Sequence, residues 1–292
     1  MPTSSHVFLV SGASRGLGRA ITEAALAAGH SVVAGARTTS TLTDLAVEHP
    51  DHLTVVKLDV TRDDHVRTAV STAVNRFGRL DVVVNNAGYA NMGAIEDVDF
   101  ADFRAQIDTN FLGVVRLTQA ALPIMRTQRS GHIVQVSSVG ARVVRPGLAA
   151  YQSAKWAVTG FSSVLAKEVA PLNVKVTVLE PGGMRTDWAG SSMRVDAVRE
   201  EYTTTVGAAI ETSSSGHLGA SDPAKVAALL LDVVEMVEPP ARLLVGPDAY
   251  RYGTAAMREL LTDDQRWEAL SASTVADDAT ADQLDPLGAV DH

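Results

Sequence analysis

The sequence predicts an α/β fold in which a doubly wound, mostly parallel sheet of seven strands carries helices on both faces. Seven apolar runs of strand length recur along the chain, and helical stretches separate them. The chain has 292 residues and is 46% hydrophobic, which suffices for one large core. Alternating strands and helices of this kind build a parallel sheet that is covered on both sides.

The predicted strands are residues 6–10, 31–36, 53–58, 80–84, 132–136, 174–179 and 242–245. Two helices between them have clear ends. Gly29 suits the position after a helix over 20–28, because glycine tolerates the left-handed backbone found there. Asp222 and Pro223 suit the cap and first turn of a helix over 224–237.

The sequence predicts one catalytic domain over residues 1–250, followed by a C-terminal extension over 251–292. A long segment at about 187–220 follows the sixth predicted strand, and its length indicates a substrate lid. The extension is acidic and alanine-rich, with one short helix expected around 263–270. From Asp277 onward few residues can pack, so we expect flexible chain there.

Composition excludes several classes of partner. Lys and Arg number 25 against 34 Asp and Glu, which leaves a net charge of −9 with no basic block. This balance argues against nucleic acid and against a membrane surface. The sequence shows neither a signal-like start nor an apolar run of membrane-spanning length, so a cytoplasmic location is expected. There is no cysteine and no paired histidine spacing, so we expect no metal and a redox role only through a bound cofactor.

A glycine-rich turn joins the first predicted strand to the first helix. Backbone N–H groups at such a helix N-terminus attract a pyrophosphate. Taken alone, a glycine turn can equally serve close packing of helix and strand, but its place directly after the first strand favours cofactor binding. The residues expected to contact the cofactor here are Gly12, Ser14, Arg15, Gly16, Leu17 and Gly18.

Arg37 ends the second predicted strand, where the adenosine ribose of a dinucleotide is expected. No acidic residue lies between Glu23 and Asp44, and Arg15 is a second cation nearby in the glycine turn. A guanidinium accommodates a 2′-phosphate, whereas a carboxylate would bond a 2′-hydroxyl. We therefore expect NADP in preference to NAD. The alternative is that Arg37 is an ordinary solvated loop cation.

Polar and small residues end the third and fourth predicted strands, at the edge where α/β sheets bind ligands. Each group taken alone is also compatible with ordinary turn chemistry. The residues expected to contact the cofactor are Asp59, Val60, Asn86, Ala87 and Gly88.

Tyr151 and Lys155 are spaced i and i+4 on a predicted helix, so they share one face of it. An ammonium beside a phenol favours the phenolate and lowers the pKa of the phenol from its usual ~10. A tyrosine tuned in this way can exchange a proton with an alcohol or a ketone. The pair therefore predicts carbonyl chemistry.

Together with Ser138 and the Pro181–Thr186 stretch, these motifs closely resemble those of the short-chain dehydrogenase/reductase family in its single-domain Tyr-x-x-x-Lys branch. The resemblance covers about residues 6–246. It implies a Rossmann-type fold, Tyr151 as general acid/base and Lys155 as the residue that holds the nicotinamide ribose. Ser138 would orient the substrate carbonyl, because it precedes Tyr151 by thirteen positions, although Ser137 stands beside it.

The resemblance also implies that Asn110 keeps a proton-relay water near the lysine. A second set of residues would border the nicotinamide, with Thr186 bonding its carboxamide. These residues are Pro181, Gly182, Met184 and Thr186.

The segment after the last strand loosely resembles 17β-hydroxysteroid dehydrogenases, which implies a bulky or apolar small-molecule alcohol or ketone. The expected function is NADP(H)-dependent interconversion of a secondary alcohol and a ketone, or of a primary alcohol and an aldehyde. One alternative is a 3-oxoacyl or polyketide-type ketoreductase acting on a carrier-bound substrate. Another is a non-catalytic NADP-binding regulator. The family implies a homodimer or homotetramer that pairs through helices over 102–126 and 151–170.

Overall fold

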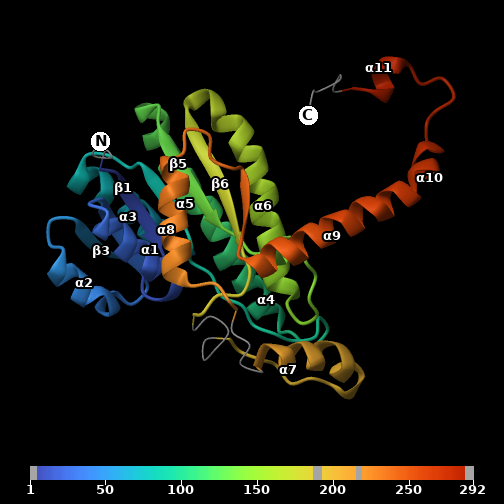
Figure 1. The fold of residues 1–292 in the computed structure, drawn as a ribbon, viewed down its shortest axis with the longest axis horizontal. Coiled ribbons are helices and arrows are strands. Elements are labelled where there is room, and N and C mark those ends of the chain that lie inside the picture. The colour runs from blue at the N-terminus through green and yellow to red at the C-terminus, as the bar shows by residue number, and fades with distance from the viewer. Residues whose placement is uncertain (1–4, 187–192, 215–218, 287–292) are drawn as a thin grey trace. The chain divides into compact units, whose positions relative to one another are not determined.

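The computed structural model of the chain describes residues 5–186, 193–214 and 219–286. Its centre is a seven-stranded sheet in the order β3-β2-β1-β4-β5-β6-β7 (Figure 1). Every neighbouring pair is parallel, which confirms the predicted architecture. The strands are β1 (Val7–Ser11), β2 (Ser31–Ala36), β3 (Leu53–Lys57), β4 (Val82–Asn85), β5 (Gly131–Val136), β6 (Val174–Pro181) and β7 (Arg242–Val245).

The strand order reverses at β1. From the edge strand β3 the chain returns to place β4 on the other side of β1, so that Val10 pairs with Ala34 of β2 and with Val84 of β4. Loops that leave β1 and β4 therefore run in opposite directions, and a crevice opens at the carboxyl ends of the strands. The candidate site lies at this edge.

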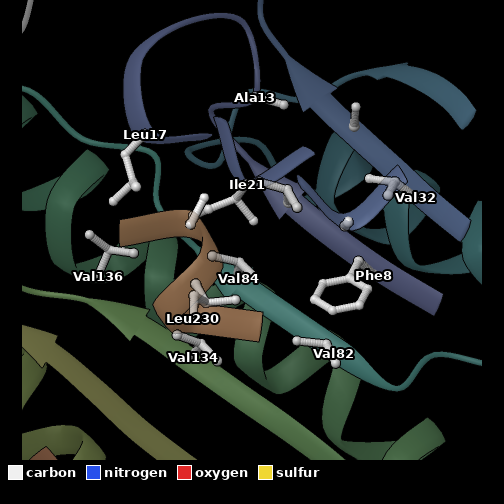
Figure 2. Close-up of a cluster of buried hydrophobic side chains, with 14 of the residues drawn as sticks. Phe8, Ala13, Leu17, Ile21, Val32, Val82, Val84, Val134, Val136 and Leu230 are labelled. Atoms are coloured by element: carbon white, nitrogen blue, oxygen red, sulfur yellow. The ribbon is translucent and has the colours of Figure 1, made fainter. Parts of the chain in front are cut away.

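Helices cover both faces of the sheet. One buried cluster joins α1, α2 and α8 to side chains such as Phe8 and Val10, and Leu230 of α8 lies over the strands in Figure 2. A second cluster joins α3, α5 and α6 to Val7 and Leu9. The helices of the two layers are α1 (Gly16–Ala27), α2 (Thr43–Glu48), α3 (Asp63–Phe77), α5 (Gly113–Gln128), α6 (Ala149–Val169) and α8 (Pro223–Glu235).

Consecutive residues of β1 thus enter opposite layers, as the two-residue period of a strand requires. Because both faces are buried, the strand is apolar at every position instead of at alternate ones. Fully buried residues such as Leu230 and Ile21 each stabilise the fold by roughly 1.5–3 kcal/mol.

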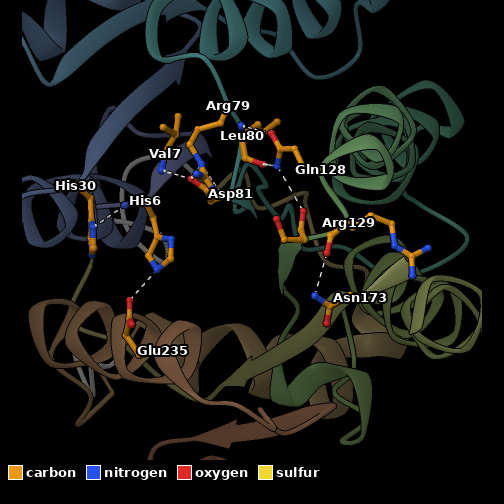
Figure 3. A network of polar contacts seen from close by, with 11 residues as sticks. His6, Val7, His30, Arg79, Leu80, Asp81, Gln128, Arg129, Asn173 and Glu235 are labelled. Atoms are coloured by element: carbon orange, nitrogen blue, oxygen red, sulfur yellow. Dashed lines mark hydrogen bonds and ion pairs between the residues drawn. The ribbon is translucent and has the colours of Figure 1, made fainter. Parts of the chain in front are cut away.

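The fourth strand begins two residues later than the sequence predicted, at Val82 instead of Leu80. The backbone N–H of Leu80 donates to the Gln128 side chain (3.0 Å), and the Asp81 carboxylate accepts from the N–H of Val7 (2.8 Å). Figure 3 shows these bonds together with the ion pair between Arg79 and Asp81. The backbone of Asp81 still bonds Val7 and His132, whereas at Leu80 the Gln128 side chain takes up both backbone groups, so the ladder ends there.

Two predicted helices are present with small shifts. The first starts at Gly16, inside the glycine turn, and ends at Ala27 with Gly29 in the left-handed conformation (φ 82°). The second, α8, starts at Pro223, and the side chain of Asp222 caps it by accepting from the N–H of Ala224 (2.8 Å). Both ends follow the predicted capping chemistry.

The predicted lid segment lies partly outside the described residues, which omit 187–192 and 215–218. Its described part contains a short 3-10 turn (Glu200–Tyr202), a π-helical turn (Thr203–Gly207) and α7 (Ala208–Ser214). A bridge between Met92 and Val195 ties this part to the loop after β4. Among the described residues, no helix is long and apolar enough to cross a membrane.

The chain divides into two compact units, Met1–Gly253 and Thr254–His292. The expectation of one short helix around 263–270 is wrong. Instead α9 (Pro247–Arg266) is a 20-residue helix that crosses the boundary between the units, and α10 (Glu268–Ala272) follows it. A further turn, α11 (Ala281–Leu284), begins with a capping box in which Thr280 and Gln283 bond each other's backbone.

Candidate active site

A cavity of about 770 Å³ lies at the carboxyl ends of the strands. Its wall is made by the loops that follow β1 to β6, which is the position at which open α/β sheets bind ligands. All residues predicted to form the site line this cavity except Gly18 and Asn110, which lie just behind the wall. The structure therefore brings together residues that the sequence spreads over nearly two hundred positions.

The glycine turn is folded tightly against the loop after β4. Gly12 and Gly16 have positive φ angles (71° and 56°), which side chains other than glycine rarely adopt. A Cβ atom on Gly18 would lie 2.3 Å from the carbonyl oxygen of Gly12, so this position also requires glycine. The Asn86 side chain donates to the carbonyl oxygens of Ser11 (3.0 Å) and Gly12 (3.2 Å) and fixes the turn.

Charged side chains gather at the end of the cavity beside β2 and β3. Arg15 is the N-cap residue of α1 and lines the cavity with Arg37 and Asp59. Burial raises the pKa of Asp59, but hydrogen bonds from Thr61 and the nearby charges of Arg37 and His65 outweigh it, so the pKa lies below its usual value. Asp59 is therefore a carboxylate acceptor close to a guanidinium.

Tyr151 lies at the opposite end, on α6, with only 8% of its surface exposed. Its hydroxyl forms a hydrogen bond with Ser138, which follows β5. The structure corrects the expected effect on acidity: burial raises the pKa of Tyr151 to about 12, and the bond with Ser138 lowers it by less. Burial wins because the phenolate is desolvated, while the Lys155 nitrogen stands 5.6 Å from the centre of the ring.

Lys155 is buried, and its ammonium donates to the carbonyl oxygen of Val136 (2.7 Å) at the end of β5. Burial lowers the pKa of Lys155 to about 8. Gly88 provides the space beside it, since a Cβ there would lie 3.7 Å from the lysine nitrogen and 2.6 Å from Asn110 Oδ1. The lysine is thus held between the ends of β4 and β5.

Asn110 is fully buried in a π-helical turn (Asp108–Leu112) between α4 (Phe100–Ile107) and α5. Its side chain donates to the Tyr89 carbonyl oxygen (2.8 Å) and accepts from the Tyr89 N–H (2.9 Å). A π turn of this kind marks functional positions in many helices. Both bonds hold the loop after β4 against the site.

The two adjacent serines have different surroundings. Ser137 hydroxyl contacts the carbonyl oxygen of Lys155 (3.2 Å) and the Thr159 hydroxyl (3.3 Å), so its side chain points into α6. Ser138 instead accepts from the N–H of Gly140 (3.0 Å) and bonds Tyr151. The geometry thus favours Ser138 as the serine that meets a substrate.

The loop after β6 borders the cavity next to the glycine turn. Thr186 lies close to it, since a Cβ on Gly16 would be 3.6 Å from the threonine side chain. Asp248, at the start of α9, accepts from the N–H of Gly183 (2.7 Å) and so ties this loop to α9. Pro181, Gly182, Met184 and Thr186 all line the cavity.

Sequence reasoning missed the residues that wall the cavity around Tyr151. These residues come from the loop after β4 and from the segment between Ser138 and Tyr151, where no local pattern marks a ligand site. The additional wall residues are Tyr89, Met92, Arg145 and Leu148. Met92 and Leu148 form an apolar cluster with Tyr151, against which Met193 packs.

The chain matches the family model of short chain dehydrogenases over residues 6–196. It is 53% identical to oxidoreductase BOA17 of Botryotinia fuckeliana over 92% of this chain and 99% of that protein. Its fold is similar to the crystal structure of a short-chain dehydrogenase from Streptomyces avermitilis, with a TM-score of 0.88 and 36% identity over 94% of this chain and all (100%) of the other.

A further similar structure is an alcohol dehydrogenase from Thermococcus sibiricus complexed with 5-hydroxy-NADP. It has a TM-score of 0.69 and 25% identity over 83% of this chain and 96% of the other. The order of the motifs, the parallel sheet and these matches agree with one another and confirm the family resemblance. The chain belongs to the short-chain dehydrogenase/reductase family and is an NAD(P)-dependent oxidoreductase.

Proposed function

We propose that the protein is an NADP(H)-dependent oxidoreductase that interconverts a ketone and a secondary alcohol, or an aldehyde and a primary alcohol, with Tyr151 as the general acid/base. One observation carries the proposal: Ser138 and Tyr151 form a hydrogen-bonded pair of hydroxyls in the cavity wall, with the Lys155 ammonium beside them. Two such hydroxyls can polarise one carbonyl oxygen from the same side.

The residues along the cavity suit the successive parts of a bound dinucleotide. Backbone N–H groups of the turn over 12–18 would hold the pyrophosphate at the start of α1, as helix N-termini do for anions. Arg15 and Arg37 would meet the adenosine ribose and its phosphate, and Thr186 the carboxamide. Gly12 and Gly18 let the turn pack against Asn86 and Ala87, which fixes the turn at the cavity.

The reduced nicotinamide, when bound, supplies a hydride for the carbonyl carbon. Tyr151 donates its proton to the carbonyl oxygen, and Ser138 donates a hydrogen bond to the same oxygen. A phenol with its pKa raised by burial stays protonated at neutral pH, so it is ready to act as the acid in ketone reduction. The Lys155 ammonium, which the Val136 carbonyl oxygen positions, would hold the ribose, and Asn110 keeps the loop after β4 in place.

The apolar lining of the cavity near Tyr151 suits a bulky, largely apolar substrate. Met92 and Leu148 are buried there, and Met193 from the segment before α7 packs against them. Such apolar walls recognise substrates by the area that they remove from water.

To test the function, the purified protein is mixed with NADPH and a panel of ketones, and nicotinamide absorbance is followed. Absence of ketone-dependent oxidation across the panel would contradict the proposal.

We expect the cofactor preference to depend on Arg37. In Arg37→Asp, attraction to the 2′-phosphate becomes repulsion, and a carboxylate suited to a 2′-hydroxyl takes its place. The ratio of kcat/KM for NADPH over NADH should fall by about tenfold or more, which corresponds to roughly 1.4 kcal/mol or more.

The matched control is Arg67→Asp, which makes the same charge change at an exposed position on α3. It should leave the ratio unchanged. A wild-type protein that prefers NADH, or an Arg37→Asp variant with the wild-type ratio, would show that Arg37 is only a surface cation.

We also expect kcat/KM for ketone reduction to fall above pH ~8. Burial lowers the pKa of Lys155 to about 8, so the ammonium is charged below this pH and loses its proton above it. A pH profile of kcat/KM should therefore be flat at lower pH and fall above the inflection. In Lys155→Arg the guanidinium stays charged, so the residual activity should lack this inflection. An unchanged inflection in that variant would assign it to another group.

A further inference from the structure

Arg145 is a charged residue in the cavity wall near Tyr151, beside the apolar side chains of Met92 and Leu148. It lines the main cavity and also a shallower groove bordered by Val144, Ala208 and Tyr252. Arg145 thus marks the boundary between the catalytic cavity and the outside. A molecule whose carbonyl reaches Tyr151 would have its outer end beside this guanidinium.

The backbone around Arg145 is fixed to the catalytic helix. The N–H of Arg145 donates to the Gln152 side-chain oxygen (3.0 Å), and the nitrogen of the same side chain donates to the Val143 carbonyl oxygen (2.5 Å). Gln152 directly follows Tyr151 and is buried. The position of Arg145 is therefore set relative to the general acid/base, which is what a group that selects substrates requires.

The guanidinium carries an unneutralised charge within the described part of the chain. Its Nη2 donates to the Ala209 carbonyl oxygen of α7 (2.8 Å), and none of the ion pairs among the described residues includes it. A guanidinium has five N–H donors and keeps its charge at any pH the fold tolerates. One bond to a neutral carbonyl leaves most of that capacity for a ligand.

The residues around Arg145 indicate what kind of ligand would meet its charge. Met92, Leu148 and Met193 offer only carbon to a substrate. Thr212 and Ser213 also line this part of the cavity, but their hydroxyls are uncharged. Among the described lining residues the one carboxylate is Asp59, which lies beside Arg37. The guanidinium is half-buried, so a substrate that covers it removes it further from water, which costs free energy unless the substrate brings an anion. An apolar substrate without charge would leave this cost unrecovered.

We propose that Arg145 is a specificity-determining residue and that the substrate is an oxo acid: a ketone on an apolar skeleton with a carboxylate at its outer end. This inference rests on the proposed function, because it takes the ketone to lie at Tyr151. Arginine pairs with carboxylates through two parallel charge-assisted bonds, which fixes the orientation of the substrate as well as its affinity. The reverse reaction would take the corresponding hydroxy acid.

The test compares ten-carbon oxo acids, with the ketone at each internal position, with their primary amides of the same size. Each is assayed with NADPH on wild type, Arg145→Gln, Arg145→Lys and the surface control Arg67→Gln. Wild type should favour at least one acid over its amide, and Arg145→Gln should lower this kcat/KM ratio by about tenfold or more. Arg145→Lys should keep part of the preference, and Arg67→Gln all of it. Wild-type preference for the amides, or an unchanged ratio in Arg145→Gln, overturns the proposal.

A binding measurement separates this inference from the proposed function. Calorimetric titration of the same proteins with decanoate and with decanamide, in the presence of NADP, needs no turnover. Decanoate should bind wild type more tightly than decanamide, and Arg145→Gln should remove the difference. If ketones are reduced but neither the kcat/KM ratio nor this difference depends on Arg145, the inference fails and the function stands. If no ketone is reduced while decanoate binding depends on Arg145, the proposed function fails and the anion site stands.

Discussion

Tyr151→Phe should lower turnover by about 10²- to 10⁴-fold while the fold and NADPH binding persist. The substitution removes the one hydroxyl that can pass a proton to the carbonyl oxygen, and the ring keeps its volume in the wall of the cavity. The hydrogen bond with Ser138 is lost as well. Steady-state assays at saturating NADPH and a binding titration of NADPH on the same protein would measure both effects.

The control for this prediction is Tyr202→Phe, which also deletes a phenol hydroxyl. That hydroxyl bonds Glu96, outside the residues that line the cavity. The control should keep near-native turnover. Near-native turnover in Tyr151→Phe itself would remove Tyr151 from the mechanism, whereas loss of NADPH binding would indicate that the phenol serves the cofactor site first.

Glu180→Gln should destabilise the protein by about 2–4 kcal/mol, because it leaves two arginines facing a neutral amide in the interior. Glu180 is fully buried on β6, where its carboxylate accepts from Arg142 (2.6 Å) and from Arg242 (3.0 Å to Nε and 2.5 Å to Nη2). This loss of stability is at the lower end of what a broken buried ion pair usually costs, since Arg242 is one third exposed and can reach water. Urea unfolding followed by circular dichroism would measure the loss.

The matched control is Glu168→Gln, the same substitution at an exposed position of α6. It should change the free energy of unfolding by less than about 0.5 kcal/mol. Arg142 follows Ser138 by four residues, so the Glu180 pair also ties the catalytic loop to the sheet. A Glu180→Gln protein with wild-type stability would show that the two arginines find other partners at no cost.

Most of the fold could be predicted because each strand is buried on both faces. Strands of this kind are apolar throughout, and their alternation with helices predicted a doubly wound, mostly parallel sheet. The exact start of β4 could not be predicted. It depends on Gln128 and Asp81 bonding the backbone of Leu80 and Val7, and no local pattern carries such distant contacts.

The length of α9 was missed although the sequence holds a start signal for it. Pro247 and Asp248 are the residue types that favour a first helical turn, but Gly253 six residues later suggests an interruption. In the structure Gly253 is buried, and a Cβ there would lie 2.8 Å from the Leu244 side chain. Close packing against Leu244 explains the glycine inside the helix, and helix propensity alone does not reveal such a contact.

The residues proposed to bind the cofactor could be located from the sequence, whereas most of those proposed to face the substrate could not. The glycine turn and the residues at Asn86 and Tyr151 form short motifs whose order is characteristic of the family. Arg145 and Met92 reach the cavity from irregular loops, so only the tertiary structure places them there. The acidity of Tyr151 was also out of reach of the sequence, because its direction depends on weighing burial against the charge of Lys155.

The most direct test of the proposed function follows the hydride itself. NADPH that carries deuterium at nicotinamide C4 on the transferred face is incubated with the wild-type protein and a ketone that it consumes, and the alcohol is analysed by mass spectrometry and NMR. The proposed chemistry predicts one deuterium on the carbinol carbon and a proton from water on the oxygen, with product formation greatly reduced in Tyr151→Phe. NADPH oxidation without deuterium at that carbon, whichever face is labelled, would contradict it.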